Sequence, residues 1–427
     1  MNHHLSRGRA LQVAALTAVS AMVVAGCAPS QSSSDTSKDA GTVPDKIVIG
    51  STLPLTGAES KTGGRYKQGY ELAFDEVNAA GGLDVNGKKV KVELKLLDDT
   101  SDQAKAVNLA QRLITSDKVN AFLGTYSTSL VEAQSTVAEQ NKIPYVNGGG
   151  AATSIYTKGY KWIFGTLAPV ENLATNEMEW IDQQQKAGKL PKPAKVAIVW
   201  ENTSHGKDFR KGIQDFAKKT GSYQVVVDES FALDGTDFSA VLNKVEAAKA
   251  DLFMVDAHLP DFITMHRQYL SSGMCNKIET YGARGTEADA KKALGQKGVD
   301  YILSAVWWNK QLGDKGLNKK FVDSFTAKYG TAPEWYQAVS YEAARSLFTA
   351  ITNAKSVDKT KVRDALSTLS IDSILPGGKL SFPADKGGQA SYPFVVQQNL
   401  PDGSSPIVYP ADVATGNGTA PNPSCKG

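Results

Sequence analysis

The feature that most constrains this chain is a repeated alternation, from about residue 46 to residue 306, of short β-rich runs with longer stretches of helical periodicity. Such alternation is typical of βα units that build mainly parallel sheets. The expected strands are residues 47–51, 90–97, 121–124, 143–146, 196–200, 223–227, 252–255, 278–281 and 301–306. The predicted fold class is therefore α/β.

Between these strands, apolar residues recur at the spacing of amphipathic helices. Tyr66, Tyr70 and Phe74 fall on one face of one such helix, and this face is expected to pack in the core. A further long helix is expected over residues 333–351, because a proline is well tolerated at the start of a helix. These faces need no cofactor to explain them.

The length of the chain, 427 residues, favours two packed units over a single core. One set of βα units is complete near Ala168, and a return near Trp307 would let the helical region that follows join the first unit. The expected division is a first lobe of residues 45–168 with about 308–371, a second lobe of residues 169–307 with about 372–412, and a C-terminal tail of residues 413–427.

The first 26 residues are a different kind of segment. Arg7 and Arg9 supply a positive start, and an apolar stretch of signal-peptide length follows. It is shorter than the roughly 20 apolar residues that a membrane-spanning helix needs. The sequence Val-Ala-Gly-Cys at 24–27 resembles the bacterial lipobox, in which Cys27 becomes the lipid-modified first residue of the mature protein. An ordinary signal peptide with an incidental cysteine is the alternative.

This N-terminal pattern predicts a lipoprotein on the outer face of the bacterial cytoplasmic membrane, with residues 1–26 as its signal peptide. Residues 27–44 are poor in apolar residues, so they are expected to form a flexible tether. Once Cys27 is acylated, Cys275 and Cys425 are the two cysteines that remain. In an oxidising compartment these two can pair as a disulfide, and two unpaired thiols are the alternative.

The net charge of the chain and the absence of common catalytic motifs limit the classes of function that are expected. The 47 Lys and Arg residues against 44 Asp and Glu give a formal net charge of +3. There is no dense basic run flanked by aromatic residues, so nucleic acid is not an expected partner. The sequence also contains no His-Glu-x-x-His, Cys-x-x-Cys, Gly-x-Ser-x-Gly or Gly-x-Gly-x-x-Gly motif. No enzyme, cofactor or metal site is therefore predicted.

Three stretches carry a resemblance to a known family. They are Ile-Val-Ile-Gly-Ser-Thr-Leu-Pro-Leu-Thr-Gly at 47–57, the segment from Asn-Ala-Ala-Gly-Gly to Asp-Asp at 78–99, and Gly-Thr-Tyr-Ser-Thr-Ser at 124–129 followed by Asn-Lys-Ile-Pro-Tyr at 141–145. In order and spacing they resemble the leucine/isoleucine/valine-binding family of type I periplasmic solute-binding proteins, over about residues 46–409. The resemblance implies two doubly wound lobes with mainly parallel sheets, joined by a three-strand hinge, with ligand in the cleft.

The resemblance and the local sequence place the ligand contacts of the first lobe in two loops. One loop follows a strand, where backbone N–H groups and hydroxyls can hold a carboxylate, and the glycines at 148–150 let backbone approach a ligand closely. Helix capping by Ser127 or Thr128 is the alternative role. The candidate ligand contacts are Tyr126, Ser127, Thr128, Ser129, Gly150, Ala151, Ala152 and Thr153.

The family pattern places the contacts of the second lobe at His205, His258 and Arg284, each in a loop after a strand. Members that bind amino acids usually carry an acidic residue at the position of Arg284, where it pairs with the ammonium group. Arginine instead offers donors suited to a carboxylate. Trp307, near the crossing between lobes, would add an aromatic wall. A salt bridge for Arg284, a structural role for each histidine and simple packing for Trp307 are the alternatives.

The predicted function is capture of a small organic molecule by an ABC importer's extracytoplasmic receptor, which closes its lobes and delivers the solute to permease and ATPase subunits. A carboxylate or aromatic acid is the preferred solute. An amino acid stays open, because Glu201 or Glu287 could supply a displaced acidic partner. The alternative is a ligand sensor of the same fold. A monomer, attached to the membrane through the lipid alone, is expected.

Overall fold

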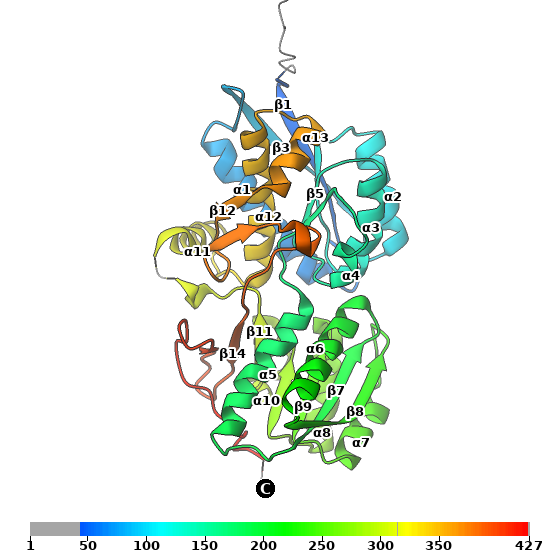
Figure 1. The fold of residues 1–427 in the computed structure, drawn as a ribbon, viewed down its shortest axis with the longest axis vertical. Helices are drawn as coiled ribbons and strands as arrows, with labels where there is room; N and C mark the ends of the chain where they lie inside the picture. The colour runs from blue at the N-terminus through cyan, green and yellow to red at the C-terminus, as the bar shows by residue number, and fades with distance from the viewer. Residues whose placement is uncertain (1–42, 314, 426–427) are drawn as a thin grey trace, which may run out of the picture. The chain divides into compact units, whose positions relative to one another are not determined.

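The computed structural model describes residues 43–313 and 315–425. The predicted signal peptide, the predicted lipid-attachment residue Cys27 and nearly all of the predicted tether lie outside these residues. Two large sheets flanked by helices organise the described chain (Figure 1). The predicted α/β class with mainly parallel sheets is confirmed. In the part of the chain described, no helix has both the length and the apolar character to cross a membrane.

The first lobe is built on a six-stranded sheet with the strand order β2-β3-β1-β4-β5-β6. Its pairs are parallel except for β2 and β3, which form a hairpin. The strands are β1 (Lys46–Leu53), β2 (Leu83–Val85), β3 (Lys88–Asp98), β4 (Ala121–Leu123), β5 (Tyr145–Asn147) and β6 (Ile163–Gly165). The helices of this lobe are α1 (Ser60–Ala79), α2 (Gln103–Thr115), α3 (Thr128–Gln140), α4 (Thr153–Tyr156), α11 (Gly316–Tyr329), α12 (Trp335–Ala354) and α13 (Lys359–Ser367).

The second lobe is built on a seven-stranded sheet with the order β15-β14-β11-β10-β9-β7-β8. The late strands β14 and β15 add to its edge in antiparallel pairs. The strands are β7 (Ala194–Glu201), β8 (Tyr223–Phe231), β9 (Leu252–Asp256), β10 (Ile278–Tyr281), β11 (Leu303–Val306), β14 (Val395–Gln398) and β15 (Ile407–Tyr409). The helices are α5 (Val170–Lys186), α6 (Ser204–Thr220), α7 (Ser239–Ala247), α8 (Leu259–Ser272), α9 (Ala288–Leu294) and α10 (Gln296–Val299).

The predicted strands are all observed, with shifted ends. The short strands β2 and β6 were not among the predicted strands. The long late helix begins at Trp335, two residues after Pro333, because Glu334 caps it in a capping box with Gln337. Small elements complete the chain: η1 (Lys310–Leu312), β12 (Ser370–Asp372), β13 (Lys379–Ser381) and η2 (Ala384–Lys386).

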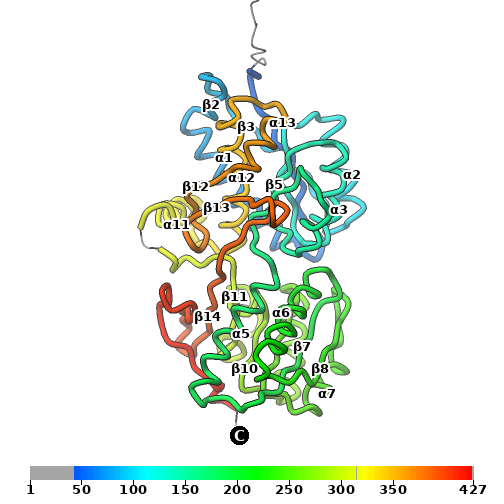
Figure 2. The backbone as a smooth tube through the Cα atoms, viewed as in Figure 1, coloured from blue at the N-terminus to red at the C-terminus, as the bar shows by residue number. Residues whose placement is uncertain are grey.

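The chain passes between the lobes three times (Figure 2). The first two passages touch, since the Trp307 indole donates to the carbonyl oxygen of Ala168 at 2.9 Å. The third comes after Ala390, whose N–H still donates to Gly165 of β6 at 2.8 Å. This is later than the predicted return near residue 372, because the β12–β13 hairpin and the segment that follows it stay beside the first sheet. We take these three passages as the hinge.

The C-terminal tail is fixed to the second lobe. Cys425 is joined to Cys275 by a disulfide. Nearby, the Asn422 N–H donates to the carbonyl oxygen of Lys277 at 2.8 Å, and the Thr419 N–H donates to the side chain of Gln398. The last residues of the described chain are therefore attached to the surface of the second lobe.

Candidate functional site

The candidate site lies between the carboxyl ends of the strands of both lobes, where helices begin. In the first lobe the relevant loops follow β1 and β4, and in the second lobe they follow β7, β9 and β10. A cavity of about 10 Å³ lies there, room for about one water molecule. Its lining residues are Tyr126, Ser127, Thr128, Gly149, Ala151, Leu167, His205, His258, Arg284, Trp307 and Trp335.

Most of the predicted contacts thus come together, although a role in binding stays a prediction. Four of them do not line this cavity: Ser129, Gly150, Ala152 and Thr153. Thr153 instead joins the lobes, because its N–H and hydroxyl both donate to Asp208 of α6, at 2.7 and 2.6 Å. Larger hollows of about 420 and 510 Å³ lie elsewhere and do not gather the predicted residues.

Helix α1 holds the first-lobe loops in place. The Tyr66 hydroxyl donates to the carbonyl oxygen of Gly148, and the Tyr70 hydroxyl donates to that of Gly124 at 2.7 Å. The apolar face that the sequence predicts for this helix therefore also positions the two loops. Gly149 is required between them, since a Cβ atom there would lie 2.0 Å from the carbonyl oxygen of Thr125.

Capping does not account for the loop at residue 127. Ser127 stands at the N-cap of α3 but makes no capping hydrogen bond with its side chain. The hydroxyl of Thr128 accepts the N–H of Ala151 at 3.3 Å, which links the two predicted loops. The side chain of Ser127 thus remains available within the cavity wall.

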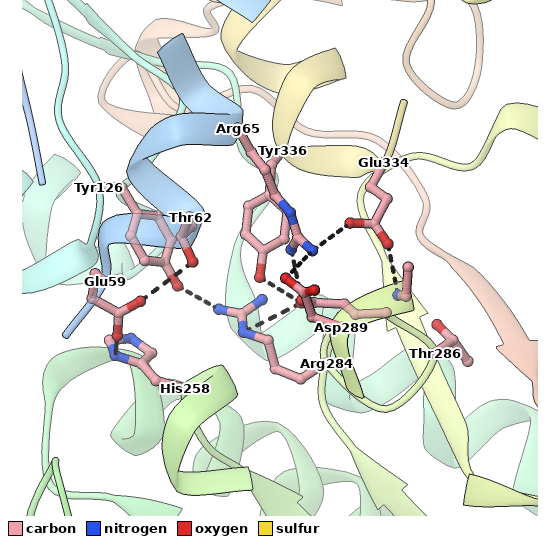
Figure 3. A network of polar contacts seen from close by, with 12 residues as sticks. Glu59, Thr62, Arg65, Tyr126, His258, Arg284, Thr286, Asp289, Glu334 and Tyr336 are labelled. Carbon is pink, nitrogen blue, oxygen red and sulfur yellow. Dashed lines mark hydrogen bonds and ion pairs between the residues drawn. The ribbon is translucent and has the colours of Figure 1, made fainter. Parts of the chain in front are cut away.

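Arg284 is the central cation of the cleft (Figure 3). It follows β10, where its N–H donates to Tyr281, and its Nη2 donates to the Tyr126 hydroxyl of the other lobe at 2.8 Å. Its guanidinium carbon lies 5.1 and 5.5 Å from the ring centroids of Trp335 and Tyr336, a cation–π arrangement. Although the side chain is buried, its Nε and Nη1 have no hydrogen-bond partner.

These two unpartnered donors are the clearest chemical feature of the site. Buried donors are normally hydrogen-bonded, and a guanidinium has no acceptor role. Burial alone would lower the pKa of Arg284, but Tyr126, Tyr336, Glu287 and Asp256 outweigh it, so the pKa lies above its usual value. The group is a fixed cation that can receive acceptor oxygens.

His258 lies between carboxylates of the two lobes. Its Nδ1 is 2.8 Å from Glu59, just before α1, and its Nε2 is 3.6 Å from Glu201, at the end of β7. Burial by itself lowers the pKa of His258, but the charges of Glu201 and Glu59 and the hydrogen bond to Glu59 raise it to about 10. His258 is therefore charged at neutral pH.

His205 belongs to a separate pair in the second lobe. Its Nδ1 lies 2.8 Å from Asp256 Oδ2, and its ring lies 6.3 Å from that of Trp307. Glu201, His205 and Asp256 bring possible metal-ligand atoms within 4.8 Å of one another. We do not interpret them as a metal site, because Asp256 is already bonded to the imidazole and the charged His258 beside Glu201 would repel a cation.

A second group of ion pairs borders the cleft. Arg65 of α1 contacts Glu287 at 2.8 Å, Asp289 at 3.0 Å and Glu334 at 2.9 Å. Glu287 and Asp289 belong to the second lobe, so Arg65 joins the two lobes (Figure 3). The Tyr336 hydroxyl also donates to Glu287.

Sequence reasoning missed Glu59, Arg65 and Asp256. A signal for two of them was present, since Glu59 follows β1 as residues 126–129 follow β4, and Asp256 ends the strand that precedes His258. Carboxyl ends of parallel strands meet at one edge, so these loops had to be neighbours. Arg65 lies within a helix and gave no such signal.

Comparison with known proteins identifies the family. The model of the family described as periplasmic binding protein matches residues 46–404. The chain belongs to this family. The predicted resemblance to leucine/isoleucine/valine-binding proteins is confirmed, and with it the fold of two lobes.

Individual members of the periplasmic binding protein family agree with this assignment. Leu/Ile/Val-binding protein homolog 8 of Brucella abortus (strain 2308) is 28% identical over 375 residues, which cover 86% of this chain and 91% of that protein. The structure of leucine-binding protein LivK of Thermotoga maritima MSB8 has a TM-score of 0.73 at 22% identity, covering 84% of this chain and 97% of that one. A solute-binding protein of an ABC transporter of R. palustris, solved in complex with benzoate, has a TM-score of 0.73 at 21% identity, covering 89% and 99%.

Proposed function

We propose that this chain is the extracytoplasmic solute-binding lipoprotein of an ABC importer, which captures a small organic acid by closing its lobes and performs no chemistry. One observation carries the proposal: Arg284 lies buried in the cleft beside aromatic rings, with two donors that have no hydrogen-bond partner. A carboxylate is the ligand group that such donors suit. The solute would be bound by Tyr126, Ser127 and Thr128 of the first lobe and by Arg284 of the second.

The carboxylates of the cleft already have partners within the protein, which favours an acid over an amino acid as the solute. An ammonium group needs an acidic partner, but Glu287 pairs with Arg65, Asp256 with His205, and Glu201 lies beside the charged His258. The benzoate complex of the R. palustris neighbour shows that this fold accepts an aromatic acid. Trp307 and Trp335 would supply flat walls for such a ring.

Closure of the two lobes is the conformational change that solute binding would favour. A ligand shifts an equilibrium between open and closed forms only by its difference in affinity for them. A solute held by Tyr126 from one lobe and by Arg284 from the other makes more contacts in the closed form. That form would then dock on permease and ATPase subunits, with Cys27 holding the protein at the outer face of the membrane.

The experiment is identification of the solute. Mass spectrometry of small molecules released from freshly purified, denatured protein is expected to show an organic acid. Calorimetric titration with benzoate and with leucine then compares the two solute classes directly. Recovery of leucine, with tighter binding of leucine than of benzoate, would contradict the acid preference.

A further inference from the structure

His258 has both of its ring nitrogens turned toward carboxylates. The Nδ1 atom is 2.8 Å from Glu59 of the first lobe, and the Nε2 atom is 3.6 Å from Glu201 of the second lobe. All three side chains are buried, and the ring of Tyr126 lies 5.8 Å away. The histidine also lines the predicted solute cavity.

This geometry favours a doubly protonated ring. A neutral imidazole has one N–H and one lone pair, so it would turn a lone pair toward one of the two carboxylates. Protonation at both nitrogens directs an N–H at Glu59, at hydrogen-bond distance, and a positive charge at Glu201, 3.6 Å away. Because the three side chains are buried, their charges act on one another with little screening.

The other charged groups around the ring do not change this result. Arg284 opposes the charge on His258, and Asp261, on the same helix, favours it. Burial raises the pKa of Glu59, but the charge and hydrogen bond of His258 outweigh burial and lower it. Glu59 therefore stays ionised beside the histidine.

We infer that Glu59 is a positioning residue for solute recognition, which reaches His258 only when the lobes meet and fixes the imidazole as a second cation beside Arg284. The inference rests on the proposed function, because it concerns the same cleft. It makes closure a step that takes up a proton.

The pH dependence of lobe closure follows from the pKa of His258 in the open and closed forms. Opening removes Glu59 from His258, so the pKa of the histidine is lower in the open form and about 10 in the closed form. The contribution of the ion pair to closure is fully present below the open-form pKa. It is lost as the pH rises toward about 10.

The test is an NMR titration of the histidine ring protons, with and without excess benzoate. The described residues hold three histidines, His205, His258 and His266, so the variant His258→Gln assigns the signal. We expect wild-type His258 to titrate at least about one unit above the ordinary value near 6.5. Glu59→Gln should lower this value, and Glu59→Asp should restore part of it.

Glu229→Gln is the matched control. Glu229 is a second-lobe glutamate paired with Lys244 at 2.7 Å, away from the cleft. This variant should leave the titration of His258 unchanged. Calorimetry of benzoate binding in buffers of different ionisation enthalpy should show proton uptake near pH 8 in the wild type and less in Glu59→Gln.

The outcomes separate this inference from the proposed function. A His258 pKa near the ordinary value, unaffected by Glu59→Gln with or without benzoate, would overturn the inference. Benzoate binding together with that result would keep the function and remove the proton link. A raised pKa that depends on Glu59, without benzoate binding, would keep the inference and exclude benzoate as the solute.

Discussion

Single residues carry the chemistry of this cleft, and most of its arginine and histidine side chains lie against carboxylates. Glu59 faces His258, Asp256 faces His205, and Glu287 faces Arg65. Arg284 is different, since it meets a neutral hydroxyl at 2.8 Å and lies 3.9 Å from the nearest carboxylate oxygen. Arg284 therefore keeps two donors free for an acceptor group of a solute.

Arg284→Ala provides the direct test at this scale. Loss of a buried, hydrogen-bonded charge pair with the solute should weaken binding by roughly 2 to 5 kcal/mol. Calorimetric titration with the identified solute measures this change. Arg284→Glu should be worse with an acid and could improve binding of a ligand with an ammonium group.

Arg210→Ala is the control for that experiment. Arg210 is a second-lobe arginine that is partly exposed, pairs with Asp228 and lies over the ring of Trp200. It should leave solute affinity unchanged. Near-wild-type affinity in Arg284→Ala would mean that this arginine is a scaffold residue, and would remove the main reason for preferring an acid.

Pairs of elements, rather than single side chains, hold the first lobe in shape. Helices α1 and α12 pack together, and both contribute to the cleft through Arg65, Trp335 and Tyr336. Their close approach depends on Gly69, where a Cβ atom would lie 2.0 Å from the Ser340 hydroxyl and 2.5 Å from the Gln337 carbonyl oxygen.

Gly69→Ala should therefore destabilise the protein, by about 1 to 3 kcal/mol, the usual cost of overpacking. Gly64 lies on the same helix, and a methyl group added there would meet no neighbouring group within 4 Å. Gly64→Ala should instead stabilise by about 0.5 to 1 kcal/mol, because alanine is the better helix former. Urea unfolding of the two variants gives the comparison, and equal effects would contradict the packing argument.

The disulfide between Cys275 and Cys425 spans 150 residues of sequence. Replacing both cysteines by serine should lower the free energy of unfolding by at most about 5 kcal/mol in the chain-entropy model. The tail after Gln398 should also become more sensitive to protease. Free alkylation of both thiols in the denatured, non-reduced protein would contradict the bond.

At the scale of the whole molecule, sequence predicted the fold better than the site. The strands were recognisable because each carries its own local pattern, and the loops at Tyr126, His258 and Arg284 followed from the strand ends. Glu59 was missed because its role depends on which helix start faces the second lobe. The third passage of the hinge was placed too early, because a short hairpin after Ser370 has no strong pattern of its own.

Membrane attachment is the other prediction at this scale, and it concerns Cys27, outside the described residues. Cys27→Ser should release the protein from membranes or leave the precursor unprocessed, because the lipid would lose its attachment atom. Metabolic labelling with a radioactive fatty acid measures this. Unchanged labelling of the variant would show that the lipid is attached to another residue.

The disulfide of the tail has a practical consequence. The first strand opens at Lys46 in one lobe, whereas Cys425 is covalently attached to the other. The two ends of the described chain therefore move with different lobes. A donor fluorophore placed ahead of the first strand and an acceptor placed after Cys425 would report opening and closing as a change in energy transfer, with no substitution in the cleft.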